Sequence, residues 1–207
     1  MSRIILALLL LTGIFGCAAE SASMRSENSP SQNQVLSEDR VSQEEFTIYD
    51  LVINSGYTRS STQLLVIQEE TAFGNIKDHS LAEQLKYVGD KLPQIDQSVL
   101  REFSSKNNKS YKLSDNFNLR VKHILAGSNV LDPMLQLPSF WREFYKKFPD
   151  AQGMLSLSRV AFNTEVNQAL VYLATASGPD TGASYYVFLT KKGNYWTILH
   201  DVKVSSV

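Results

Sequence analysis

The 207-residue sequence contains very little cysteine and no excess of charge of either sign. One cysteine cannot form an internal disulfide framework or supply a multi-thiolate metal site. The 20 Lys and Arg residues are balanced by 21 Asp and Glu, for a formal net charge of −1. A dedicated nucleic-acid-binding protein would carry a basic excess, so no nucleic-acid partner is expected.

Sequence motifs that carry chemistry are also lacking. The three histidines, His79, His123 and His200, form neither an HExxH motif nor a pair four residues apart, so no metal site and no cofactor are expected. There is no GxSxG nucleophile turn and no glycine-rich phosphate loop. His200 and Asp201 are adjacent in a predicted strand, where neighbouring side chains point to opposite faces. The sequence therefore favours a non-enzymatic protein.

The first residues of the chain have the pattern of a secretory signal. One basic residue, Arg3, precedes an apolar run over residues 4–11, which is too short for a comfortable transmembrane helix. Small and apolar residues then lead to the single cysteine in the order Ile14-Phe15-Gly16-Cys17. This stretch resembles the lipobox of bacterial lipoproteins, although Phe15 stands where a small residue is commoner. The alternative is an ordinary cleaved signal peptide followed by an incidental cysteine.

The lipobox resemblance implies that Cys17 carries a diacylglyceryl thioether, with acyl chains such as palmitate, and an amide-linked third chain. Two or more acyl chains hold a protein on a membrane almost permanently. The expected localisation is extracytoplasmic, with the membrane as a partner through the lipid anchor. Ala18 and Ala19 follow the cysteine, and no aspartate there indicates inner-membrane retention, so the outer membrane is favoured in a cell with two membranes.

The sequence divides into three parts: a lipoprotein signal peptide over residues 1–16, the lipidated cysteine with a flexible tether over residues 17–41, and one domain over residues 42–207. The tether is rich in Ser, Gln, Asn and Glu and cannot bury enough apolar surface to offset its ordering entropy. The domain is expected to begin with a capping box, Ser42 to Glu45, and a first helix over residues 43–55.

Further helices are predicted by the same local signals. A second capping box at Ser80 and Glu83 opens a helix that Pro93 ends, and Asp96 caps a third helix. Pro138 and Ser139 start a short helix, whose aromatic side chains at helical spacing we interpret as core. Boundaries within residues 90–138 are the least determined by the pattern.

Strand patterns dominate the last third of the chain. Residues 154–162, 168–175, 184–190 and 195–204 are β-type runs joined by short turn-rich segments, which predict an antiparallel four-strand meander. Residues 64–67 and 119–125 predict two earlier strands. In the last run Trp196, Ile198 and His200 are expected to share one face with Val202 and Val204. The expected fold class is α+β, with helices packed on one face of an antiparallel sheet.

Three motifs carry a further resemblance. The segment from Trp141 to Pro149 reads W-x-x-F-Y-x-x-F-P, that from Ser158 to Asn163 reads S-x-x-x-F-N, and residues 168–172 read Q-A-L-V-Y. As a set they resemble a group of uncharacterised bacterial secreted proteins and lipoproteins, over about residues 138–200. Ala161 stands where that group usually has glycine. The resemblance implies location and fold rather than an activity.

Aromatic residues on neighbouring predicted strands are the best candidates for ligand binding. Tyr172, Tyr185, Tyr186 and Trp196 could line a concave face that binds a peptide or glycan, and Asp180 lies in a Gly/Pro-rich loop at its rim. The alternatives are that the loop is a hairpin turn and that the rings are core.

The sequence favours a non-enzymatic binding or interaction module in the cell envelope, with an envelope protein, peptide or glycan as partner. An envelope hydrolase whose site is assembled from distant residues, using His123 or His200, stays open as the alternative.

Overall fold

The computed structural model describes residues 40–58, 60–72 and 80–206. Within these ranges the chain forms five α-helices, one π-helical turn and a seven-strand mixed sheet, so the predicted α+β class is confirmed. The predicted signal peptide, the predicted lipidation site Cys17, most of the predicted tether and His79 lie outside the described residues.

The helices begin where the local signals predict. Ser42 and Glu45 form the first capping box, Ser80 and Glu83 form the second, and the Asp96 side chain accepts a hydrogen bond from the Ser98 backbone N–H. A helix containing Pro133 was not predicted from the sequence. The helices are α2 (Gln43–Val52), which continues into the π-helix η1 (Ile53–Tyr57), α3 (Leu81–Lys91), α4 (Gln97–Lys106), α5 (Ser128–Leu135) and α6 (Phe140–Lys147).

The sheet combines parallel and antiparallel strands. Its strands are β1 (Leu64–Gln68), β2 (Lys122–Ala126), β3 (Ala151–Leu157), β4 (Ala161–Phe162), β5 (Gln168–Gly178), β6 (Thr181–Lys192) and β7 (Tyr195–Ser206). Their order is β2-β1-β3-β5-β6-β7, with β4 also paired to β5. Strands β5, β6 and β7 are adjacent and antiparallel, as their short connectors predict.

The expectation of a wholly antiparallel sheet is wrong, because β1 runs parallel to both β2 and β3. The long connection through α3 and α4 returns the chain to the end of the sheet where β1 began, which a parallel pair requires.

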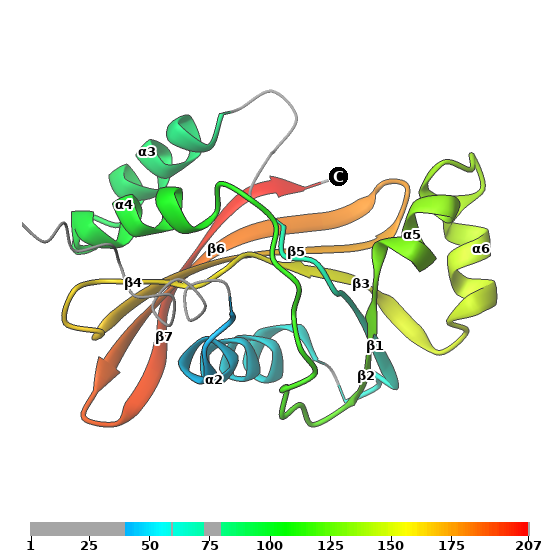
Figure 1. Cartoon of the computed structure of the whole chain (residues 1–207), viewed down its shortest axis with the longest axis horizontal. Coiled ribbons are helices and arrows are strands. Elements are labelled where there is room, and N and C mark those ends of the chain that lie inside the picture. Colours follow the sequence, from blue (N-terminus) through cyan, green and yellow to red (C-terminus); the bar gives the residue numbers. More distant parts are fainter. Residues whose placement is uncertain (1–39, 59, 73–79, 207) are drawn as a thin grey trace, which may run out of the picture.

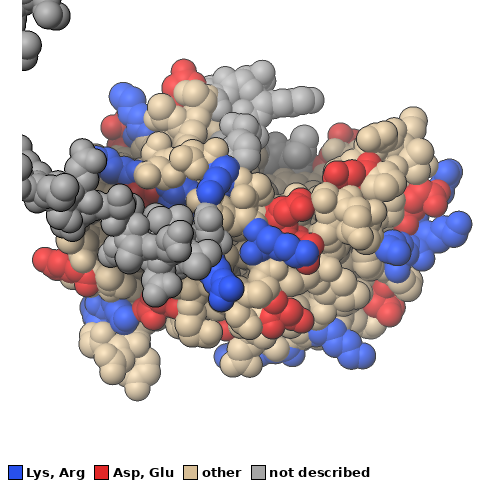
Figure 2. All heavy atoms as spheres, in the orientation of Figure 1, with Lys and Arg blue, Asp and Glu red and all other residues tan. Residues whose placement is uncertain are grey.

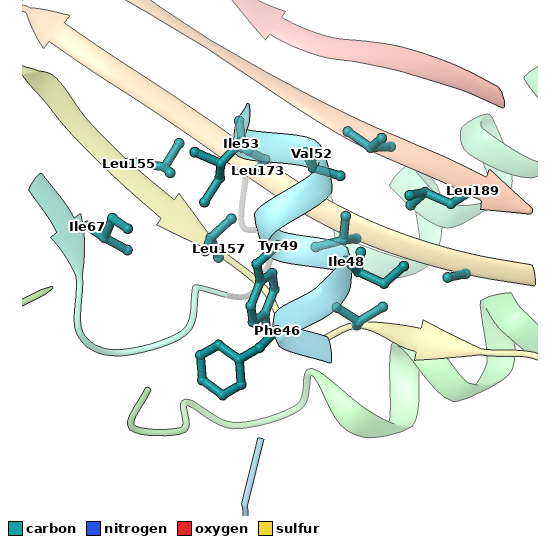
Figure 3. Packing of buried hydrophobic residues seen from close by; sticks show 14 of the residues in the cluster. Phe46, Ile48, Tyr49, Val52, Ile53, Ile67, Leu155, Leu157, Leu173 and Leu189 are labelled. Atoms are coloured by element: carbon teal, nitrogen blue, oxygen red, sulfur yellow. The ribbon is translucent and has the colours of Figure 1, made fainter. Parts of the chain in front are cut away.

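Helices cover both faces of the sheet, so the expectation that they pack on one face is wrong. On β5 the side chains of Val171 and Leu173 pack with α2, whereas Leu170 and Tyr172, which alternate with them, pack with α3 and α4. Figure 1 shows α2 on one side of the long strands and α3 and α4 on the other. Figure 3 shows the α2 side, where Ile48, Val52 and Ile53 lie beside side chains of the strands and Phe46 points away from them. Since both faces are buried, β5 is apolar on both sides.

Helices α5 and α6 form a smaller cluster over β1, β2 and β3. Phe144 of α6 and Phe148, which directly follows this helix, are buried there with Val66 of β1. Trp141 and Tyr145 pack against them and are partly buried. The aromatic face of this helix is therefore core, as its spacing predicts. The Tyr145 hydroxyl also donates a hydrogen bond to the Ser177 carbonyl at 2.8 Å, which joins α6 to the end of β5.

A β-bulge in β7 divides its side chains between the two faces. Leu189 pairs with Ile198, but the preceding residue Phe188 pairs with His200, so Leu199 is left without a partner in the register. Trp196 and Ile198 consequently pack with the α2 side, whereas Val202 and Val204 pack with the α3 and α4 side. The expectation that these residues share one face is therefore wrong, because one extra residue reverses the alternation.

Candidate binding cleft

Two of the predicted ligand-binding tyrosines belong to the core. Tyr172 and Tyr186 face each other across β5 and β6 with ring centroids 5.3 Å apart, and both are buried in the cluster beneath α3 and α4. The Tyr186 hydroxyl donates to Gln84 Oε1 at 3.0 Å. Burial raises the pKa of both hydroxyls. The prediction that these two rings line an open concave face is wrong.

Trp196 lies on the other face of the sheet and fixes the start of α2. It is buried, and its Nε1–H donates to Glu44 Oε1 at 2.6 Å. Lys191 Nζ donates to the same oxygen at 2.6 Å and lies 5.2 Å from the centroid of the Trp196 ring system. The hydrogen bond from Lys191, and then that from Trp196, lower the pKa of the Glu44 carboxyl. The tryptophan is therefore engaged by the protein itself.

Asp180 lies at the tip of the β5–β6 hairpin and is exposed. Gly178 pairs with Thr181 across the turn, which leaves Pro179 and Asp180 as its two tip residues. This supports the interpretation of the segment as a hairpin turn. Of the five predicted contact residues, Tyr185 alone is among the residues that line the cleft on the α2 side of the sheet, whereas Tyr172, Tyr186 and Trp196 are buried elsewhere.

The cleft has a volume of about 560 Å³ and lies on the α2 side of the sheet, beyond the end of η1. Its floor comes from β3, β5 and β6 near the β5–β6 hairpin, and Gly56 and Tyr57 of η1 close one side. The helix that covers the sheet ends at Tyr57, whereas the strands continue to the hairpin. An uncovered length of sheet therefore remains beside the helix terminus.

Two tyrosine rings form the aromatic part of the cleft. Tyr57 from η1 and Tyr185 from β6 have ring centroids 6.0 Å apart and an interplanar angle of 59°. Burial, together with the neighbouring Tyr185 and Asp201, raises the pKa of the Tyr57 hydroxyl well above its ordinary value of 10. Tyr57 thus stays a neutral hydroxyl throughout the physiological pH range, able to donate a hydrogen bond as well as accept one.

Polar groups surround these rings. Lys203 of β7 pairs with Tyr185 in the strand register and is exposed at the wall of the cleft. Its ammonium group makes no ion pair with any residue in the described ranges. Thr175, Thr181 and Gln152 add hydroxyl and amide groups. Gln152 also bonds to Thr62 Oγ1 and donates to the Tyr57 carbonyl at 3.4 Å, which ties the segment after η1 to β3.

Gly153 forms part of the floor in a conformation that favours glycine. Its φ is +144°, and a Cβ at this position would collide with the carbonyl oxygen of Ala176 on β5. The close approach of β3 to β5 at the edge of the cleft therefore depends on the missing side chain.

The histidines do not assemble a hydrolytic site within the described residues. His123 Nε2 lies 2.7 Å from Asp115 Oδ1, but no hydroxyl from the described part of the chain is hydrogen-bonded to the histidine. His200 is exposed and pairs with Phe188, whereas Asp201 pairs with Val187, so the two side chains lie on opposite faces as expected. Among residues 40–58, 60–72 and 80–206, no three His, Cys, Asp or Glu side chains gather closely enough to hold a metal ion.

The surface around these elements is mixed in charge. Figure 2 shows Lys and Arg interspersed with Asp and Glu on the face that it presents, without a large area of one sign. No helix in the described ranges has the length and apolar character needed to cross a membrane.

Sequence reasoning missed Tyr57, Lys203 and Thr175 as cleft residues. Tyr57 follows the helical spacing of the first helix, and the other two lie in ordinary strand alternation, so nothing local distinguishes them.

Comparisons with protein-family models, curated proteins and solved structures find no match to this chain. The resemblance of its motifs to secreted proteins and lipoproteins thus stays a prediction.

Proposed function

We propose that this chain is a lipid-anchored, extracytoplasmic bacterial lipoprotein whose folded domain binds an envelope ligand in the cleft beside Tyr57 and Tyr185. The proposed location is supported by the sequence Ile14-Phe15-Gly16-Cys17, in which the only thiol of the chain directly follows a signal-type apolar run. The 25 residues from 17 to 41 would, as a flexible chain, give the domain a reach of roughly 25–30 Å from the bilayer.

The observation that carries the binding function is the cleft. Its volume of about 560 Å³ falls within the ordinary range of small-ligand sites. It combines two aromatic rings with a lysine that has no ion-pair partner in the described ranges and with several hydroxyl and amide groups. In the described residues these groups include no histidine and no nucleophile held by a base, so binding rather than catalysis is the function they suit.

Metabolic labelling tests the anchor. The full chain is expressed in a bacterial host with an alkyne analogue of palmitate, together with Cys17→Ser and, as a control, Ser21→Ala. We expect label and membrane partition in the parent chain and in Ser21→Ala, and neither in Cys17→Ser. Equal labelling of Cys17→Ser, or an unlabelled parent chain, would refute lipidation at this cysteine.

Crosslinking in intact cells tests the cleft. The parent chain is compared with Tyr185→Ala and with Tyr195→Ala, whose side chain is 80% exposed on β7 and lies outside the cleft. We expect crosslinked species that are lost in Tyr185→Ala and kept in Tyr195→Ala. Identical crosslinking patterns for all three chains would show that the cleft is not the binding site.

A further inference from the structure

Resting on the proposed binding function, we propose that the ligand of the cleft is a saccharide that carries a carboxylate. Lys203 would pair with the carboxylate, and the rings of Tyr57 and Tyr185 would pack against the sugar.

The charge of the cleft points to a singly charged anion. Lys203 is the only cationic side chain among the lining residues and has no ion-pair partner within the described ranges. An ammonium group at the wall of a cleft attracts anions. Asp201 lies on the same face of β7 and acts electrostatically on Tyr57, so the site as a whole is not strongly positive. A carboxylate fits this balance better than a phosphate, which usually has several cationic or N–H partners.

The two tyrosines suit a sugar ring. A pyranose presents C–H groups on its faces and hydroxyls around its rim, and an aromatic ring with a polar tip can contact both. The Tyr57 hydroxyl is neutral at physiological pH, and burial raises its pKa further. Thr175, Thr181 and Gln152 add donors and acceptors along the floor and wall. A ligand with many hydroxyls matches this mixture of rings, hydroxyls and amide.

The same floor is poorly suited to an extended peptide. Peptides that dock on sheets pair their backbone with a free strand edge. Here Leu155 pairs with Thr175, Thr175 with Ala183, and Tyr185 with Lys203, so the strands of the floor are paired with one another. An extended peptide therefore finds no unpaired strand among these to extend, which favours the saccharide.

Calorimetry on the full chain, purified in detergent, tests the assignment. The probes are the disaccharide of N-acetylglucosamine and N-acetylmuramic acid, whose lactyl group carries a carboxylate, and chitobiose, which lacks that group. Galacturonic acid and its methyl ester form a second matched pair that differs by one carboxylate, and an acidic tetrapeptide represents the peptide class. We expect at least one acidic sugar to bind at least about tenfold more tightly than its uncharged match, as loss of one charged contact predicts.

Variants locate the interaction. Lys203→Met should reduce the preference for the acidic sugar to near unity, whereas Lys192→Met, an exposed lysine at the other end of β6, should leave it unchanged. Tyr185→Ala should weaken the acidic and the neutral sugar together, because it removes the ring from both complexes.

The inference is overturned by equal affinity for both members of each sugar pair, by tighter binding of the tetrapeptide than of any sugar, by an unchanged preference in Lys203→Met, or by the absence of binding of any sugar. The probe comparison uses the parent chain and so holds even if a variant fails to fold. If no sugar binds while crosslinks still depend on Tyr185, the ligand class is wrong and the proposed function stands. If the crosslinks do not depend on Tyr185, the binding function of the cleft itself fails.

Discussion

Arg159 forms a buried ion pair with Glu45, with Arg159 Nη2 2.8 Å from Glu45 Oε1 and both side chains at most 2% exposed. Glu45 belongs to α2, on one side of the sheet. Lys106, which lies 3.4 Å from the same carboxylate, belongs to α4 on the other side. The Val160 N–H also donates to Glu45, at 3.0 Å. This polar cluster therefore joins the two helical layers at the β4 end of the sheet.

Breaking this pair on one side should strongly destabilise the fold. Glu45→Gln removes the carboxylate charge that pairs with the buried Arg159 guanidinium, and we expect a loss of about 3–5 kcal/mol in the free energy of unfolding. Urea denaturation followed by circular dichroism measures it. Lys86→Met, which removes a surface pair with Asp90, is the control and should change stability by less than about 0.5 kcal/mol. A Glu45→Gln loss no larger than that of the control would contradict the prediction.

Acid should weaken the contact between α2 and β7. Hydrogen bonds from Lys191 and Trp196 lower the pKa of Glu44 below its ordinary value of 4.5. A lowered folded-state pKa means that the stabilisation is complete above about pH 4.5 and is lost as the pH falls through the folded-state pKa. Burial raises the pKa of Asp50, which acts in the opposite direction, so the comparison must isolate Glu44.

The comparison is between the parent chain and Glu44→Gln, unfolded by urea at pH 6, 5, 4 and 3. Asp50 is common to both chains and cancels in the difference. We expect Glu44→Gln to have a lower free energy of unfolding than the parent chain at pH 6, and this difference to shrink toward pH 3. A difference in the free energy of unfolding that stays constant from pH 6 to pH 3 would show that the pKa of Glu44 is the same in the folded and the unfolded chain.

Gly153→Ala should destabilise the protein and distort the cleft. The φ of +144° and the collision of a Cβ with the Ala176 carbonyl oxygen predict a cost of about 1–3 kcal/mol. Gly56→Ala, at the side of the cleft that η1 closes, is the matched control, because nothing lies within 4 Å of its added Cβ. Thermal unfolding of the two variants should separate them, and equal unfolding temperatures would count against the strained conformation.

Tyr49→Phe should cost about 0.5–1.5 kcal/mol, the usual range for one net hydrogen bond. The buried Tyr49 hydroxyl donates to the Ser158 carbonyl at 2.7 Å and thereby holds α2 against the turn between β3 and β4. Tyr87→Phe, at a ring 45% exposed on α3, is the control and should have little effect in the same urea titration. An unchanged free energy of unfolding in Tyr49→Phe would mean that the Ser158 carbonyl accepts a hydrogen bond from another donor in the variant.

Features set by neighbouring residues could be predicted from the sequence. The capping boxes at Ser42 and Ser80, the cap at Asp96 and the hairpin turn at Pro179 and Asp180 each depend on a few consecutive residues. The α+β class and the antiparallel arrangement of β5, β6 and β7 follow from strand periodicity and short connectors. The helix α5 escaped prediction because Pro133 interrupts the usual helical signal.

Only the tertiary structure decided which side chains meet. Tyr185 and Tyr186 are neighbours in sequence, yet one lines the cleft and the other is core, because both faces of the sheet are covered and residues alternate between them. The bulge at Leu199 and the end of η1 at Tyr57 depend on strand register and on how far a helix extends over the sheet. The sequence by itself determined the local elements and the candidate lipidation motif. The cleft exists only where distant segments pack, because packing and register are set by contacts far apart along the chain.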